Sequence, residues 1–296
     1  TETAKGNDLT VSDINFRFPV AETDGEVAMS LGKIDFNQNR DGTVAIILPD
    51  DMPMTVTGVD SAPEGDPFAM TINFSQSGHA ITASGSPEAM TYLYTAQGFV
   101  MDMTNVQVGD DKLSEQDARV KFTGTNLSST TTMTVGDMRG YVQSGNIENM
   151  GYDVYIKDPE QAGQGEIPLE VAQGADMATM MAAGFAVQGT LGYASGTSEV
   201  DIKDPENGNY VMSTTSQGGD FGFKMGADGL AYDVAQRDVN VAVTMEMMPF
   251  PFEITMAESG FNLAMPVSKS DEVQDFAFGL KLRDFTMSDV IWSMFD

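Results

Sequence analysis

The sequence Gly151-Tyr152-Asp153-Val154-Tyr155-Ile156-Lys157-Asp158-Pro159-Glu160 sets a pattern that recurs along the chain. Tyr152, Val154 and Ile156 alternate with more polar residues, so an extended conformation gives one mostly apolar face and one more polar face. Asp158-Pro159 then interrupts the alternation. The stretch therefore predicts a half-buried β-strand that ends in a turn.

The same pattern returns at Glu199–Glu206 (EVDIKDPE) and begins again at Ala231–Val234 (AYDV). Near the N-terminus the alternation changes register at Ser12-Asp13, which predicts a bulge or a bend. Asp41-Gly42 separates two alternating runs, which is a strong hairpin signal. Further alternating runs lie at 27–31, 34–36, 44–48, 54–56, 70–74, 81–83, 99–103, 106–108, 120–122, 133–135, 221–225, 239–245, 252–256, 261–265 and 276–282.

Only two stretches favour helix, Asp176–Ala183 and Ser288–Phe295. Two short helices cannot cover the apolar faces of so many strands, so the sheet must cover itself. It can form a sandwich, close on itself, or curl into a trough whose floor is free for an apolar ligand. The sequence thus predicts an all-β fold, a long antiparallel meander in a curved or self-covering sheet system. We expect one extended β domain, 1–296, and leave open two pseudo-repeated halves, 1–150 and 151–296.

Composition limits the functions that remain. The chain has 44 acidic and 15 basic side chains, a net charge of −29, and no Cys. Such a field repels phosphate backbones and anionic lipid headgroups, which argues against nucleic-acid binding and electrostatic membrane adsorption. The absence of Cys excludes thiol catalysis, disulfides and thiolate metal sites. No apolar run reaches the length of a membrane helix.

No catalytic or metal-binding pattern stands out. His79 is the single histidine, no Gly-x-Ser-x-Gly motif accompanies it, and its position beside Gly78 predicts a surface turn. Asn37-x-Asn39-x-Asp41-Gly42 resembles the opening of a calcium loop, but the twelfth position is Leu48 where a Glu is needed. We therefore interpret it as a hairpin turn. We expect no enzymatic activity, no metal and no cofactor.

Methionine is unusually frequent, with 22 Met against one Trp. Met adapts to irregular apolar cavities and binding surfaces, so its alternating positions are compatible either with ordinary core packing or with the lining of an apolar groove. If the sheet forms such a groove, the predicted lining residues are Met101, Met103, Met133, Phe221, Phe223, Met225, Met245 and Met256.

Three phrases look familiar together: 132–139 (TMTVGDMR), 258–267 (ESGFNLAMPV) and 282–289 (LRDFTMSD). With them the chain resembles the alphaproteobacterial exported envelope family catalogued as domain of unknown function 2125. The resemblance implies a periplasmic or outer-envelope location, a signal peptide before this start, and more sequence after Asp296. It implies no known activity and no catalytic residues.

Two functions from different classes follow. The first is a non-enzymatic envelope protein that holds a lipid or another apolar ligand in a curved β groove. The second is a structural or accessory subunit of an envelope assembly, which would bind a protein partner through edge strands or the terminal helix. Co-purified lipid would favour the first function, and a partner recovered by crosslinking would favour the second.

Overall fold

A computed structural model describes residues 1–20, 25–59, 67–109, 111–135, 140–157, 184–206, 208–227, 229–246, 248, 250–266 and 273–289. Within these ranges all regular elements are strands, and they belong to one 18-stranded sheet, which confirms the predicted all-β fold. Most of the two predicted helices, 176–183 and 288–295, lies outside the described residues. No helix among the described residues is long and apolar enough to cross a membrane.

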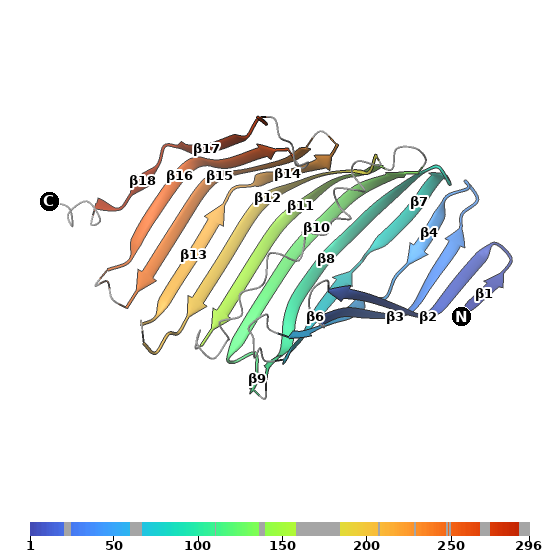
Figure 1. The fold of residues 1–296 in the computed structure, drawn as a ribbon, viewed down its shortest axis with the longest axis horizontal. Helices are drawn as coiled ribbons and strands as arrows, with labels where there is room; N and C mark the ends of the chain where they lie inside the picture. Colours follow the sequence, from blue (N-terminus) through green and yellow to red (C-terminus); the bar gives the residue numbers. More distant parts are fainter. Residues whose placement is uncertain are drawn as a thin grey trace.

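The first half of the sheet consists of β1 (Glu2–Lys5), β2 (Asp8–Val20), β3 (Gly25–Gln38), β4 (Val44–Ile47), β5 (Asp51–Val59), β6 (Pro67–Ser77), β7 (Ala80–Ser86), β8 (Ala89–Val108) and β9 (Asp111–Leu113). The second half consists of β10 (Ala118–Thr134), β11 (Gly140–Ile156), β12 (Ala186–Ile202), β13 (Tyr210–Ser216), β14 (Gly219–Gly226), β15 (Gly229–Met245), β16 (Phe252–Met265), β17 (Ala277–Arg283) and β18 (Thr286–Met287). The strands follow one another across the sheet nearly in chain order (Figure 1).

One pairing departs from the predicted antiparallel meander, because β11 and β12 run parallel. A parallel pair needs a long crossover connection, and residues 157–185 are long enough to provide it. The pairing also explains the sequence repeat. Val154 lies opposite Val200 and Ile156 lies opposite Ile202, so the two copies of the repeated pattern are neighbours in register.

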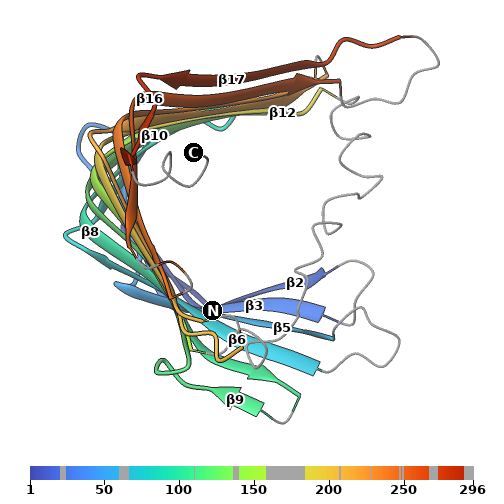
Figure 2. The same cartoon turned by 90° about the vertical axis from the view of Figure 1, so that its left-hand side faces the viewer.

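The sheet is folded into a trough that runs across the strands. Viewed along the trough, Figure 2 shows an upper arm that contains β17, a steep wall, and lower parts that contain β5, β6 and β9. The corner between the upper arm and the wall is sharp. We call the row of residues at this corner the bend line. The parts of the strands on the same side of the bend line as β17 are the upper arm. The parts on the same side as β18 are the lower arm.

The bend line crosses the sheet from β2 to the edge formed by β17 and β18. Its positions are directly opposed except at β15, where Asp238 follows Arg237, the residue opposite Gly218. Several of its residues have the left-handed backbone conformation, among them Asp13 (φ 57°), Asn126 (φ 50°), Asp238 (φ 47°) and Asp284 (φ 50°). Its members are Asp13, Gly32, residues 48–50, Gly78, Gln97, Asn126, Glu148, Ala194, Gly218, Asp238, Ala257 and Asp284.

The predicted irregularity at Ser12-Asp13 is part of this line. Ser12 pairs with Lys33 and Ile14 pairs with Leu31, so no extra residue is inserted. Asp13 is therefore a bend and not a bulge. The left-handed residue reverses the order in which side chains alternate between the two faces. The apolar residues at odd positions before Asp13 and those at even positions after it therefore lie on the same face of the sheet.

That shared apolar face is the concave one. Leu31, Ala96, Phe99, Ile147 and Val239 are at most 9% exposed, and each lies on this face within two residues of the bend line. These five residues lie inside the corner, where the bend brings side chains of the two arms together. The opposite face is convex, and its side chains spread apart into solvent.

Candidate functional site

An unbroken row of apolar side chains follows the concave face of the lower arm. From β2 to β16, each strand that contributes to it places one apolar residue directly opposite the next. The row is Phe16, Met29, Met54, Ile72, Met103, Val120, Val154, Val200, Met212, Val243 and Phe252. We call it the apolar row. It makes a continuous apolar strip along the trough.

Charge is segregated between the two faces. In β2 to β8 and β10 to β18, no Asp, Glu, Lys or Arg that the structure describes falls on the concave face, although 20% of the chain is charged. Glu2, in edge strand β1, is on the concave face because it pairs with Val11. The convex face has Asp8, Arg17, Glu26, Lys33, Asp35, Asp51, Asp102, Arg119, Lys121, Asp153, Glu199, Asp201, Asp220, Lys224, Asp233, Arg237, Glu253, Glu258, Lys281 and Arg283.

All eight lining residues predicted from the sequence lie on the concave face. The lower arm holds Met101, Met103, Met245 and Met256, and the upper arm holds Met133, Phe221, Phe223 and Met225. Met101 and Met133 are each 41% exposed, so they present apolar surface to the trough. Their contact with a ligand stays a prediction. The sequence reasoning missed the other members of the apolar row, since cross-strand register was needed to align them.

Two ladders of aromatic rings strengthen the concave face. In the middle of the sheet, Phe74, Phe99 and Phe122 stack with centroid separations of 6.1 Å, and Tyr152 meets the last of them edge-on. In the upper arm a second ladder, which we call the upper ladder, joins Phe221, Tyr232, Phe261 and Phe278 through edge-to-face contacts of 5.0 to 6.0 Å. Such contacts stabilise neighbouring strands beyond simple burial.

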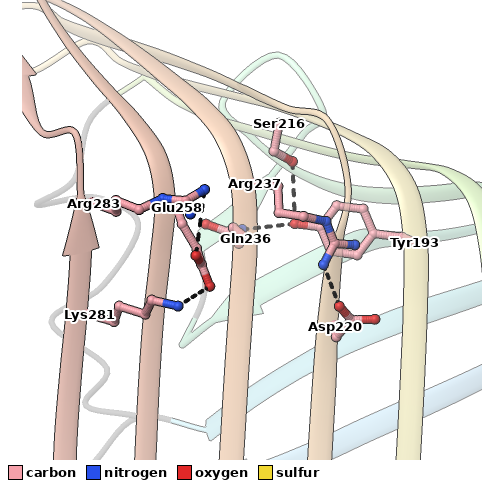
Figure 3. A network of polar contacts seen from close by, with 8 residues as sticks. All are labelled: Tyr193, Ser216, Asp220, Gln236, Arg237, Glu258, Lys281 and Arg283. Carbon is pink, nitrogen blue, oxygen red and sulfur yellow. Dashed lines mark hydrogen bonds and ion pairs between the residues drawn. The ribbon is translucent and has the colours of Figure 1, made fainter.

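Polar groups inside the corner are paired with one another. The Tyr94 hydroxyl donates to Gln76 Oε1 at 2.6 Å, and Gln76 Nε2 donates to the Pro49 carbonyl at 2.9 Å. Burial raises the pKa of the Tyr94 hydroxyl, so this hydroxyl remains a donor at neutral pH. Farther along, the Tyr193 hydroxyl accepts from Gln236 Nε2 and from Ser216 Oγ (Figure 3). Satisfied polar pairs fix the bend without placing charge in the trough.

The convex side of the bend line is held by ion pairs, which Figure 3 shows beside the tyrosine cluster. Arg237 Nη1 contacts Asp220 Oδ2 at 2.5 Å, and Lys281 Nζ contacts Glu258 Oε1 at 2.6 Å. Arg283 lies 3.8 Å from the same Glu258 carboxylate. The hydrogen bond from Lys281 is the largest influence that lowers the pKa of Glu258. These charges face away from the trough.

His79 does not have the surface position expected from the sequence. Its side chain is only 8% exposed; Nε2 lies 3.2 Å from the Leu48 carbonyl oxygen and Nδ1 lies 3.3 Å from Asp50 Oδ1. The correction has a plain cause, since the turn at Gly78 folds the ring against the segment that joins β4 and β5. The histidine is thus part of the bend and is not placed beside a serine nucleophile.

The stretch that resembles a calcium loop is the predicted hairpin turn. Asp41 Oδ1 accepts hydrogen bonds from the backbone N–H and the hydroxyl of Thr43, and β3 pairs with β4 across it. Among the described residues no group of three or more His, Asp or Glu side chains could hold a metal ion. The described geometry therefore offers an extended apolar surface.

No protein-family model matches the chain, and no curated protein matches it. The resemblance to an exported envelope family stays a prediction.

Proposed function

We propose that the protein is a non-enzymatic envelope protein that holds lipid acyl chains in the concave trough. The observation that carries the proposal is the absence of charged side chains from the concave face of β2 to β8 and β10 to β18 within the described residues. A sheet face that met only water would be expected to include charged residues in a chain this acidic. The concave face instead has the chemistry of a hydrocarbon-binding surface.

A lipid fits this surface better than a peptide does. The floor of the trough is a sheet whose backbone groups bond to neighbouring strands, so it offers side chains and few free backbone donors or acceptors. A peptide laid on it would leave its own N–H and C=O groups unpaired in an apolar setting, which costs several kcal/mol. An acyl chain has no such groups. Met side chains along the strip can also adjust to chains of different length and unsaturation.

Contact with the floor of the trough supplies a modest gross driving force. Full burial of one methylene is worth about 0.8 kcal/mol, and a chain that lies against the floor on one side gains about half of that. About fifteen methylenes would then contribute ~6 kcal/mol before the cost of immobilising the chain. This magnitude supports reversible binding, which a carrier needs.

Native mass spectrometry of protein purified from the envelope, followed by organic extraction, tests the proposal. The expected result is a reproducible added mass that extracts as acyl lipid. A bare protein mass, together with no uptake of lipid added in vesicles, would reject it. Cell fractionation tests the envelope location separately.

A matched pair of variants separates the two faces. Met101→Glu puts a charge on the concave face, and Val100→Glu puts the same charge one residue away on the convex face. We expect Met101→Glu to lose bound lipid while Val100→Glu keeps it, because only the first places an unpaired carboxylate against the chain. Equal lipid content in both folded variants would contradict the groove.

A role as an accessory subunit is the second candidate. One observation favours it, because β17 pairs with β16 on one side and has no described strand on the other. Unpaired strand edges bind extended segments of other proteins. Recovery by crosslinking of a defined envelope protein at β17, from a preparation free of lipid, would favour this function over lipid binding.

A further inference from the structure

We propose that acyl chains enter and leave the trough at its β17 end. The inference rests on the proposed lipid-binding function and concerns the route that the ligand takes. It starts from a difference between the two edges of the sheet.

At the β17 edge the apolar floor continues to the last strand. Phe278, Leu280 and Leu282 lie on the concave face and are 61%, 65% and 50% exposed. The charged neighbours Lys281 and Arg283 point to the convex face, where both lie within ion-pair distance of Glu258. Edge strands usually have charged side chains that discourage contact with apolar partners. Here these charges are turned away from the trough.

The rim next to β17 is also hollowed. A cavity of about 570 Å³ lies where the upper-arm ends of β14 to β17 meet. Its walls combine Leu230 and Met265 of the concave face with Lys224 and Ala277 of the convex face. The upper ladder of rings leads towards it from the interior and ends at Phe278. The upper ladder therefore brings apolar side chains from the inside of the trough to this edge.

The other edge differs from this one in the upper arm. There the last strand is β1, whose four residues are all exposed, and Glu2 is on the concave face next to Val11. In the lower arm β2 itself is the edge, and Phe16 lies at it. A methylene that passes a carboxylate strips water from it, which costs free energy that the apolar edge does not demand. The two ends of the trough are thus unequal in the upper arm.

Movement along the trough is favoured over movement away from its floor. A chain that slides along the apolar row exchanges one set of apolar contacts for an equivalent set. A chain that lifts out of the trough loses all its contacts with the floor at once, and each methylene then costs about half of the ~0.8 kcal/mol that a fully buried methylene is worth. The end of the trough is therefore the route with the smaller barrier.

Because the chain has no Cys, a single introduced thiol can be labelled selectively. Leu280→Cys, carrying a bulky maleimide, would obstruct the β17 end. Ala277→Cys places the same label on the convex face of the same strand, and Val11→Cys places it on the concave face at the other end. The measurement is the rate at which each protein takes up a fluorescent acyl lipid from phosphatidylcholine vesicles.

We expect the label at Leu280→Cys to slow uptake by about tenfold, which corresponds to ~1.4 kcal/mol in the barrier, with Ala277→Cys and Val11→Cys close to the unlabelled protein. Equal rates for the three labelled proteins, or a larger effect at Val11→Cys, would overturn the inference. If the unlabelled protein takes up no lipid, the proposed function itself fails, and that outcome is distinguishable from a misplaced entrance.

Discussion

Asp238 illustrates how a single residue allows a long strand to turn a corner. Its left-handed backbone (φ 47°) lies between Gln236 and Val239, which both face the trough, and the pairing of β15 with β16 keeps one register across it. An L-residue in this conformation costs about 1–2 kcal/mol, and Asp and Asn tolerate it better than most residues do. The bend line therefore favours Asp, Asn and Gly at its left-handed positions.

A β-branched residue at this position should weaken the fold. We expect Asp238→Val to lower the free energy of unfolding by about 1–3 kcal/mol, because Val is poorly compatible with a positive φ. Asp238→Gly serves as the matched control and should differ from the parent by less than about 1 kcal/mol. Urea unfolding measures both. Equal losses in the two variants would show that the carboxylate, and not the backbone, matters at this position.

Gly124 provides a second test at the residue scale, since it lies under an aromatic ring. A Cβ at Gly124 would come within 2.1 Å of the Phe99 side chain, whereas a Cβ at Gly189, also on the concave face, would meet nothing within 4 Å. We expect Gly124→Ala to cost about 1–3 kcal/mol through overpacking, and Gly189→Ala to be neutral or slightly stabilising. Thermal or urea unfolding compares them. Adding Phe99→Leu to Gly124→Ala should recover part of the loss, and no recovery would exclude the ring as its cause.

The strand at the C-terminal edge should respond to acid. Lys281 lowers the pKa of Glu258, so the pair stabilises the folded edge above the ordinary Glu pKa of 4.5 and loses this contribution as the pH falls through the lower folded-state value. We expect hydrogen exchange in β17 to accelerate over that acidic window. Lys281→Gln should remove much of this pH dependence, because the largest influence on the carboxylate is gone. An unchanged acid response in Lys281→Gln would assign it to other groups.

Individual strands were the part of the fold that sequence could predict best. Alternation with period two depends only on residues close together in the chain, so the strand that contains Tyr152, Val154 and Ile156 was predicted. The irregularity at Ser12-Asp13 was predicted as a bulge or a bend, and the structure shows a bend. The parallel pairing of β11 with β12 was not predicted. The two copies of the repeated pattern, 46 residues apart, nevertheless lie directly opposite each other in this pairing. His79 was misplaced because its contacts, Leu48 and Asp50, come from another strand connection.

At the scale of the whole molecule, the trough is long relative to its proposed ligand. About twelve strand positions spaced at ~4.8 Å give a length of roughly 50 Å. One acyl chain spans about 15 Å, half of a ~30 Å hydrocarbon core. We expect saturated protein to bind more than one acyl chain, and native mass spectrometry during a lipid titration would count them. Saturation at a single chain would confine binding to a local part of the trough.

The sequence predicted which residues of a strand share a face, but not the surface that the strands form together. Alternation correctly grouped Met101 with Met103 and Phe221 with Phe223 on one face of their strands. It could not show that both pairs face the same trough, because a bend line separates them and reverses the odd and even positions. That relation depends on the left-handed residues and on cross-strand pairing, neither of which has a signal local enough to be found from one sequence.

The sheet has one layer, and each strand makes its main contacts with the strands hydrogen-bonded to it. A protein built in this way behaves as a linear array, in which stability is approximately a sum over neighbouring units. A hairpin could be gained or lost in the middle of the array without redesigning a distant core, provided that its bend residue stayed in line. The length of the trough is therefore a quantity that evolution, or a protein engineer, could change in steps of two strands.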